Sequence, residues 1–290
     1  RFRTVESMIR TDDRRNPLKH LTETSGDEYP SKTLKVLYEY SQRGERGCAE
    51  LLLKRYTDET IYNRETKEWL KYKNGVWVKD SILNIKWRSQ EFLLYIFTKI
   101  AHLAEAQEFR LKHLARDESD NEQEFKREAS RYKKYALSFD KTKKAVTYNK
   151  TSDQILALLA TAEDIGTANS DFDQHPLLIN PQNGYYDLEQ DQFHDSDPKK
   201  RFLCQFRTNF IPEAKPEKWI KFLETIFEGD QERIEYIQKL VGISLTGKAD
   251  FQAVIFCFGD GRNGKSTFIE TLRRLFGDYF GNITGETLLS

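Results

Sequence analysis

The sequence has few of the residues that build disulfide or metal frameworks. Its three cysteines stand at positions 48, 204 and 257 without a C-x-x-C pair, and its five histidines are scattered. This spacing argues against a disulfide scaffold and a zinc site, and it fits a reducing compartment. No apolar stretch approaches the ~18 residues of a membrane helix, and no signal peptide is visible. We therefore expect neither a membrane protein nor a secreted one.

Net charge is also absent, because 46 Lys and Arg residues balance 46 Asp and Glu residues. Charged residues make up 32% of the chain and apolar ones 38%, which is typical of a strongly solvated protein. A nucleic-acid partner would therefore be held by a local basic patch and not by the field of the whole chain. The 290 residues suffice for two domains with cores of their own.

One glycine-rich stretch, from Gly259 to Ser266, matches the phosphate-loop pattern G-x-x-x-x-G-K-[ST] at every fixed position. Residues 253–258 before it are apolar, and several are β-branched or aromatic, which predicts a buried strand. Apolar residues after it recur at helical spacing as far as Gly277, which predicts a helix ending there. Strand, glycine-rich turn and helix in this order predict a site for ATP and Mg²⁺.

The residue types of this loop suit the chemistry of phosphate binding. Glycines let successive backbone N–H groups turn toward an anion, and the helix that follows aims its positive end at the same place. We expect Lys265 to reach the β- and γ-phosphates as the catalytic residue, and the Ser266 hydroxyl to help hold Mg²⁺. The alternative is a glycine-rich turn that binds nothing. The expected nucleotide-binding residues are Gly259, Asp260, Gly261, Arg262, Asn263, Gly264, Lys265, Ser266 and Thr267.

A phosphate-loop NTPase also needs an acidic residue at the tip of a later strand. Glu270, Asp278 and Glu286 follow the loop, but none of them ends an apolar, strand-like run. The chain also begins with Arg1 and not with Met. We therefore expect it to be a piece of a longer polypeptide, with little ATPase activity of its own.

The most basic segment runs from Lys126 to Lys150, where nine basic residues face two acids and four aromatic rings are interleaved. Cations on phosphates and rings on bases would make a single-strand-binding surface. The alternative is an ordinary solvated helix face. The expected DNA contacts are Lys126, Arg127, Arg131, Lys133, Lys134, Lys143 and Lys144.

The rest of the chain reads as helices and short hairpins. Helical spacing predicts helices after Ser31 (as a cap) and over 49–56, one or two over 88–116, and further ones near 125–136 and 155–159. Strands are expected over 60–62, 69–72 and 76–78, with Trp69 and Trp77 as core residues or, alternatively, as a base-stacking platform. Residues 177–188 predict a hairpin with a type I′ turn at Asn183-Gly184. Two helices follow Pro216, separated by Gly229 and the cap Asp230.

Four separated elements resemble those of one family. They are Trp69–Trp77, the hairpin Leu177–Leu188, the helical pair Trp219–Gly247, and the loop Phe258–Phe268 with Asn263 before its second glycine. In this order they resemble the phage and plasmid primase–helicases of superfamily 3, which are related to the poxvirus primase–helicase. The resemblance covers roughly residues 45–290.

The resemblance implies a mixed α/β fold, with a mostly helical N-terminal helicase region and β-hairpins followed by the start of a phosphate-loop AAA+-type motor. It implies the helicase region over 46–215, a helical hairpin over 216–247 and the motor over 248–290. The polar, charge-mixed composition of residues 1–30 indicates a linker or arm, which we place over 1–45.

The implied activity is that of a replicative DNA helicase, which hydrolyses ATP to move along and unwind DNA. The implied partners are single-stranded or forked DNA and further copies of the chain in a hexameric ring. The acidic strand, sensor asparagine, arginine finger and DNA-gripping hairpin are expected beyond Ser290, and a primase module before Arg1. The expected location is the cytoplasm, of a bacterial host if a phage or mobile element encodes the protein. Two alternatives stay open: another phosphate-loop enzyme such as a kinase, and a DNA- or partner-binding module in which nucleotide is structural.

Overall fold

The computed structural model describes residues 28–248, 255–259 and 261–284. The fold is mixed α/β and mostly helical, as the sequence predicts. The chain divides into two compact units, of which one comprises Arg1–Leu70 and Lys79–Thr167 and the other Lys71–Val78 and Ala168–Ser290. The main division between the two units follows residue 167. The expected boundaries at 45, 215 and 247 stay a prediction.

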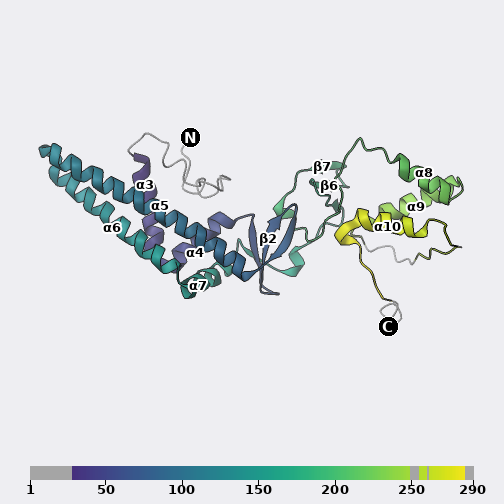
Figure 1. Ribbon diagram of the computed structural model, residues 1–290, viewed down its shortest axis with the longest axis horizontal. Coiled ribbons are helices and arrows are strands. Elements are labelled where there is room, and N and C mark those ends of the chain that lie inside the picture. The colour runs from purple at the N-terminus through teal and green to yellow at the C-terminus, as the bar shows by residue number, and fades with distance from the viewer. Residues whose placement is uncertain (1–27, 249–254, 260, 285–290) are drawn as a thin grey trace. The chain divides into compact units, whose positions relative to one another are not determined.

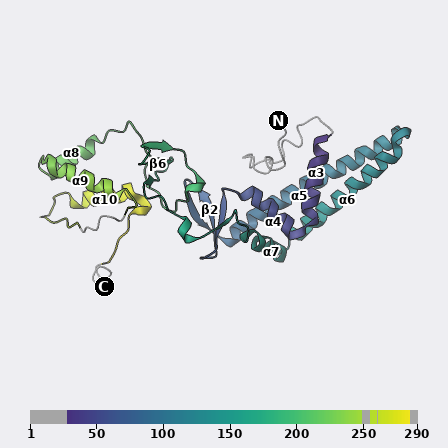
Figure 2. The same cartoon turned by 180° about the vertical axis from the view of Figure 1, so that it is seen from behind.

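Five helices build the first unit within its described residues: α3 (Glu28–Gln42), α4 (Gly44–Tyr56), α5 (Ile82–Asp117), α6 (Glu122–Val146) and α7 (Asn149–Ala160). The expected one or two helices over 88–116 form the single 36-residue helix α5. Its start is fixed because the Ser81 side chain accepts a 3.1 Å hydrogen bond from the backbone N–H of Asn84. A 3-10 turn (Ser119–Asn121) leads into α6, and Figures 1 and 2 both show α5 and α6 side by side.

The core of the first unit is formed by apolar side chains that its helices turn toward one another. Each large side chain buried in this way stabilises the fold by about 1.5–3 kcal/mol. Among the most fully buried are Leu34, Leu37, Leu52, Ile85, Phe97, Phe139 and Ile155.

The segment expected as a linker or arm, 1–45, is structured where it is described. Residues 28–42 form α3, and the buried Leu34 and Leu37 fix this helix in the core. The expected cap Ser31 lies inside α3, because the helix begins at Glu28. Residues 1–27 lie outside the described part of the chain.

A four-stranded sheet has the order β3-β2-β1-β4, with β1 (Thr60–Asn63), β2 (Glu68–Lys73), β3 (Val76–Asp80) and β4 (Gly166–Thr167). β1 and β4 are parallel, with Tyr62 opposite Gly166. Asn74 and Gly75 between β2 and β3 both have positive φ, of 51° and 86°. This is the backbone of the tight hairpin turn that the Asn-Gly pair predicts. The side chains of Trp69 and Trp77 are buried, which confirms the core interpretation of these rings.

Within its described residues, the second unit holds a small antiparallel sheet and three helices. The sheet has the order β5 (Leu178–Ile179), β6 (Tyr185–Asp187), β7 (Gln192–His194), and the helices are α8 (Glu217–Ile226), α9 (Gln231–Ser244) and α10 (Lys265–Phe276). The helical pair after Pro216 is confirmed, since the Asp230 side chain caps α9 by accepting from the backbone N–H of Arg233 at 3.1 Å. The described part of this unit also has three 3-10 turns, Asn169–Asp171, Pro198–Lys200 and Gly277–Tyr279.

The predicted hairpin of the second unit forms, but its predicted turn does not. Five residues separate β5 from β6, and Asn183 lacks the positive φ that a type I′ turn requires. The side chain of Asn183 instead bridges the backbone of Phe210, accepting from its N–H at 2.8 Å and donating to its carbonyl at 2.9 Å. Asn180, buried at the start of this loop, donates to the carbonyl of Cys204 at 2.9 Å. These contacts set the loop's course in place of a two-residue turn.

No helix in the described ranges is long and apolar enough to cross a membrane.

Candidate functional site

The residues of the predicted phosphate loop lie immediately before and at the start of α10. Gly259, Arg262 and Gly264 have φ values of 144°, 65° and 84°, in the region that favours glycine. Gly264 ends the loop, and Lys265 is the first residue of α10. The predicted helix and its end at Gly277 are confirmed. Asp260 lies outside the described residues.

The Lys265 side chain folds back across the loop that precedes it. Its Nζ donates to the backbone carbonyl of Gly259 at 2.8 Å and to Oδ1 of Asn263 at 2.7 Å. The loop is close-packed here, since a Cβ added at Gly259 would lie 2.3 Å from Nδ2 of Asn263. These two acceptors among the described residues hold the ammonium at the loop, beside the first turn of α10. Ser266 and Thr267 lie in that turn with exposed side chains.

The strand predicted before the loop does not form in its described residues. Residues 255–258 have no strand pairing, and Ile255, Phe256 and Phe258 are 50%, 78% and 91% exposed. Residues 253–254 lie outside the described part. Strand propensity is a preference for a pleated, half-buried position, and no described strand lies beside this segment to supply one. The prediction of a buried strand is therefore wrong for 255–258.

Helix α8 supports the end of the loop, a contact that sequence reasoning missed. A Cβ added at Gly264 would lie 2.6 Å from Cγ2 of Ile226 and 3.3 Å from Cε2 of Phe222. One turn into α10, Phe268 stacks on Trp219 of α8 with ring centroids 5.6 Å apart. The signal for this contact was the apolar stripe of α8, which precedes the loop in the sequence.

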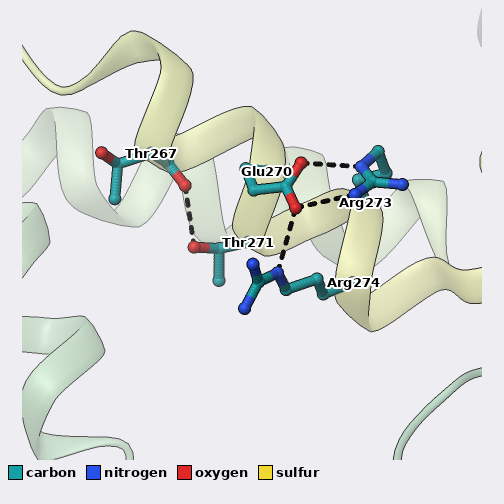
Figure 3. Close-up of polar contacts among 5 residues, drawn as sticks. All are labelled: Thr267, Glu270, Thr271, Arg273 and Arg274. Carbon is teal, nitrogen blue, oxygen red and sulfur yellow. Dashed lines mark hydrogen bonds and ion pairs between the residues drawn. The ribbon is translucent and has the colours of Figure 1, made fainter.

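Figure 3 shows the polar contacts along α10 beyond the loop. The carboxylate of Glu270 accepts from Nε of Arg273 at 2.7 Å and from Nε of Arg274 at 3.0 Å. The hydrogen bonds from these two guanidinium groups, with Arg273 first, lower the pKa of Glu270 to about 2. The Thr271 hydroxyl donates to the carbonyl of Thr267 at 2.8 Å.

The acids after the loop are thus engaged where they are described. Glu270 accepts hydrogen bonds from two arginines of its own helix. Oδ1 of Asp278 lies 3.9 Å from a terminal guanidinium nitrogen of Arg207. Glu286 lies outside the described residues. Among described residues no group of three or more His, Cys, Asp or Glu side chains is placed to hold a metal ion. The role of Ser266 toward Mg²⁺ stays a prediction.

The basic segment lies on α6 of the first unit, and the structure contradicts the aromatic half of the predicted surface. Tyr132, Tyr135 and Phe139 are buried in the core, where Tyr135 packs on Tyr38 of α3 with centroids 4.4 Å apart. These rings cannot stack on bases, because they hold α6 against its neighbours. Tyr148, just after α6, is exposed.

The predicted cations of α6 differ in their surroundings. Lys126 pairs with Glu122, Arg131 with Glu128 at 2.5 Å, and Lys143 with Asp140 at 2.6 Å. The ammonium of Lys134 lies 5.8 Å from the ring centroid of Tyr38. Arg127, Lys133 and Lys144 are exposed, and no ion pair links them to another described residue. The predicted phosphate loop lies in the second unit, whereas α6 lies in the first.

Comparison with known proteins places the chain in a family. Residues 49–228 match the model of the family described as D5 N terminal like, which is more than half of the chain. The chain belongs to the D5 N terminal like family. This confirms the resemblance to primase–helicases related to the poxvirus protein. The D5 N terminal like match ends at residue 228, before the phosphate loop begins.

The chain is also similar to viral proteins. It is 23% identical over 263 residues to the protein named "Putative helicase L207/L206" of Acanthamoeba polyphaga mimivirus, covering 87% of this chain and 26% of the relative. It is 27% identical over 142 residues to the uncoating factor OPG117 of monkeypox virus and of vaccinia virus, covering 45% of this chain and 18% of each relative. The aligned part thus spans about a quarter or less of the length of these relatives.

Proposed function

We propose that this protein acts in an ATP-driven DNA helicase of the primase–helicase type, and that Gly259–Thr267 is its nucleotide-binding loop. The observation that carries the proposal is the Lys265 ammonium, held across a loop with positive φ at Gly259 and Gly264 at the start of a helix. Helix N-termini and glycine-rich loops bind phosphate because their backbone N–H groups point at the anion. The family and a relative named as a helicase support the same function.

The residues of the loop have distinct roles in this proposal. ATP with Mg²⁺ supplies the phosphoryl group whose transfer to water drives the motor. The first turn of α10 binds the phosphate chain through backbone N–H groups, and Lys265 exchanges the Gly259 carbonyl and the Asn263 amide for the β- and γ-phosphates. Ser266 follows Lys265 in the first turn of α10. In this proposal its hydroxyl helps to hold Mg²⁺. The proposal includes single-stranded or forked DNA as the substrate and a hexameric ring as the assembly.

The test compares Lys265→Ala with Lys239→Ala, an exposed lysine of α9 outside the loop. Binding of ATP with Mg²⁺ is measured by calorimetry. We expect Lys265→Ala to weaken binding at least tenfold and Lys239→Ala to leave it unchanged, with similar thermal unfolding in both. If Lys265→Ala binds ATP like the unaltered protein, the loop assignment is wrong.

A second measurement separates the motor from other nucleotide-binding proteins. In the protein as its gene encodes it, single-stranded DNA is expected to stimulate ATP turnover, and Lys265→Ala to abolish it. Stimulation by a small metabolite instead of DNA would identify a kinase. Binding of ATP without turnover under either condition would identify a module in which nucleotide is structural.

A further inference from the structure

Helix α6 segregates its residues into two faces that the sequence interleaves. Its buried positions include Ala129, Tyr132, Ala136, Phe139 and Val146, which pack into the core. Beside this buried row six exposed residues follow one another at spacings of three or four, which places them on one face of the helix. We call this row the basic stripe; it consists of Lys126, Ser130, Lys133, Leu137, Lys141 and Lys144.

The basic stripe carries four cations and no acid. It extends from position 126 to 144, or about 27 Å at the rise of an α-helix. Arg127 and Lys134 are exposed beside it. Away from the stripe the charges of α6 are mixed, since Arg131 pairs with Glu128 and Lys143 with Asp140. On the stripe only Lys126 has an acidic partner among the described residues, namely Glu122.

A groove between α5 and α6 opens at one end of the stripe. It has a volume of about 720 Å³, and Lys126, Ser130 and Lys133 line it together with Lys112 and Arg116 of α5. Its two carboxylates, Glu108 and Glu122, are each paired with a lysine one turn away on the same helix. Four cations against two acids leave the groove with a net positive charge. The stripe and the groove therefore form one continuous basic path within the first unit.

We propose that this path binds the phosphate backbone of single-stranded nucleic acid without reading its sequence. The inference rests on the proposed helicase function, and it names where the first unit meets the strand. A nucleic-acid backbone has regularly spaced negative charges, which a row of lysines on one rigid helix can follow. Sequence-independent contact is expected because contacts to phosphates carry no sequence information. Tyr132, Tyr135 and Phe139 of α6 are buried and so are not available to bases.

The experiment uses the full 290-residue chain and a fluorescein-labelled thirty-nucleotide oligo(dT). Binding is measured by fluorescence anisotropy at 50 and 200 mM salt, without nucleotide. The stripe variant is Lys133→Glu/Lys141→Glu/Lys144→Glu. The matched control is Lys35→Glu/Lys67→Glu/Lys99→Glu, which changes the net charge equally at exposed lysines off the stripe. A stripe variant with Gln in place of Glu guards against misfolding, and circular dichroism checks all of them.

Loss of three phosphate contacts lowers the salt slope of single-strand binding by about 2. The affinity ratio of the unaltered protein to the stripe variant is then expected to shrink about 20-fold between the two salt concentrations. The Gln variant is expected to lose affinity in the same direction, and the control to bind like the unaltered protein.

Three results would overturn the inference: no binding of oligo(dT) by the unaltered protein at 50 mM salt, undiminished binding by the stripe variants, or an equal loss in the control. A fourth is equal binding of polyglutamate with the same sensitivity to the stripe, which would assign the path to an acidic polypeptide. ATP binding is measured on the same samples. Failure of the nucleotide site would leave the oligo(dT) result intact, so the two proposals fail separately.

Discussion

Replacing Gly264 with Ala tests both the backbone of the phosphate loop and its support by α8. Gly264 has a φ of 84°, and a left-handed conformation costs a residue with a Cβ about 1–2 kcal/mol. The new Cβ would also lie 2.6 Å from Cγ2 of Ile226, closer than such atoms approach. Overpacking of this kind costs about 1–3 kcal/mol. The free energy of unfolding of the second unit should therefore fall by about 2–5 kcal/mol.

The two contributions are separated by adding Ile226→Ala, which removes Cγ2 and leaves the backbone strain. The double variant should be more stable than the sum of the two single changes predicts, by about 1–3 kcal/mol. Urea unfolding followed by tryptophan fluorescence measures this, since Trp219 stacks on Phe268 beside the loop. The matched control is Gly261→Ala, where an added Cβ would meet no described atom within 4 Å, and little change is expected.

The reasoning would be refuted by additive effects of Gly264→Ala and Ile226→Ala to within about 0.5 kcal/mol. Additivity would mean that Ile226 of α8 does not pack against the loop at Gly264. A Gly264→Ala variant as stable as the unaltered protein would refute the left-handed conformation as well.

Two further predictions concern the first unit and the thiols. The Asp80 side chain is 1% exposed and accepts from Arg88 at 2.5 Å, so Asp80→Ala should lower the free energy of unfolding by about 3 kcal/mol, because it leaves a largely buried guanidinium unpaired. Glu68→Ala breaks a surface pair with Lys79 and should lower it by less than about 1 kcal/mol. Equal losses in urea unfolding would contradict this. Burial, followed by the charge of Glu45, raises the pKa of the Cys48 thiol to about 12. Iodoacetamide at pH 8 should therefore label the exposed Cys257 first and leave Cys48 unmodified, as peptide mass analysis would show. Early labelling of Cys48 would contradict the burial of its side chain.

Much of the helical architecture follows from periodicity, and so do its corrections. Apolar residues at helical spacing predicted α5, α6, α8 and α9, and local signals placed the ends, such as Asp230 before α9. The error on α6 came from reading its composition without its period. Tyr132, Tyr135 and Phe139 lie three or four residues apart, on the side of the buried Ala129 and Ala136. That spacing already favoured a core face over a base-stacking surface.

The candidate site was predictable only where its residues are local in sequence. The loop, its glycines and the start of α10 follow from the pattern that ends at Ser266. The support from Ile226 and Phe222 needs the relative position of two helices some 40 residues apart in sequence, which no local rule supplies. The strand prediction for residues 255–258 was wrong for the same reason, because a strand depends on partner strands that its own sequence does not specify.

The contacts with α8 fix the end of the loop at Gly264, whereas the Lys265 side chain can exchange its hydrogen-bond acceptors. Gly264 lies against Ile226 and Phe222, so the backbone that starts α10 is held before any phosphate binds. Among the described residues, the Lys265 ammonium donates to acceptors of the loop itself, the Gly259 carbonyl and Oδ1 of Asn263. A phosphate can replace those acceptors without moving the helix, and a site already held in place loses less free energy to ordering when its ligand binds. Loosening α8 should therefore weaken nucleotide binding even though Ile226 and Phe222 carry no group that contacts a phosphate.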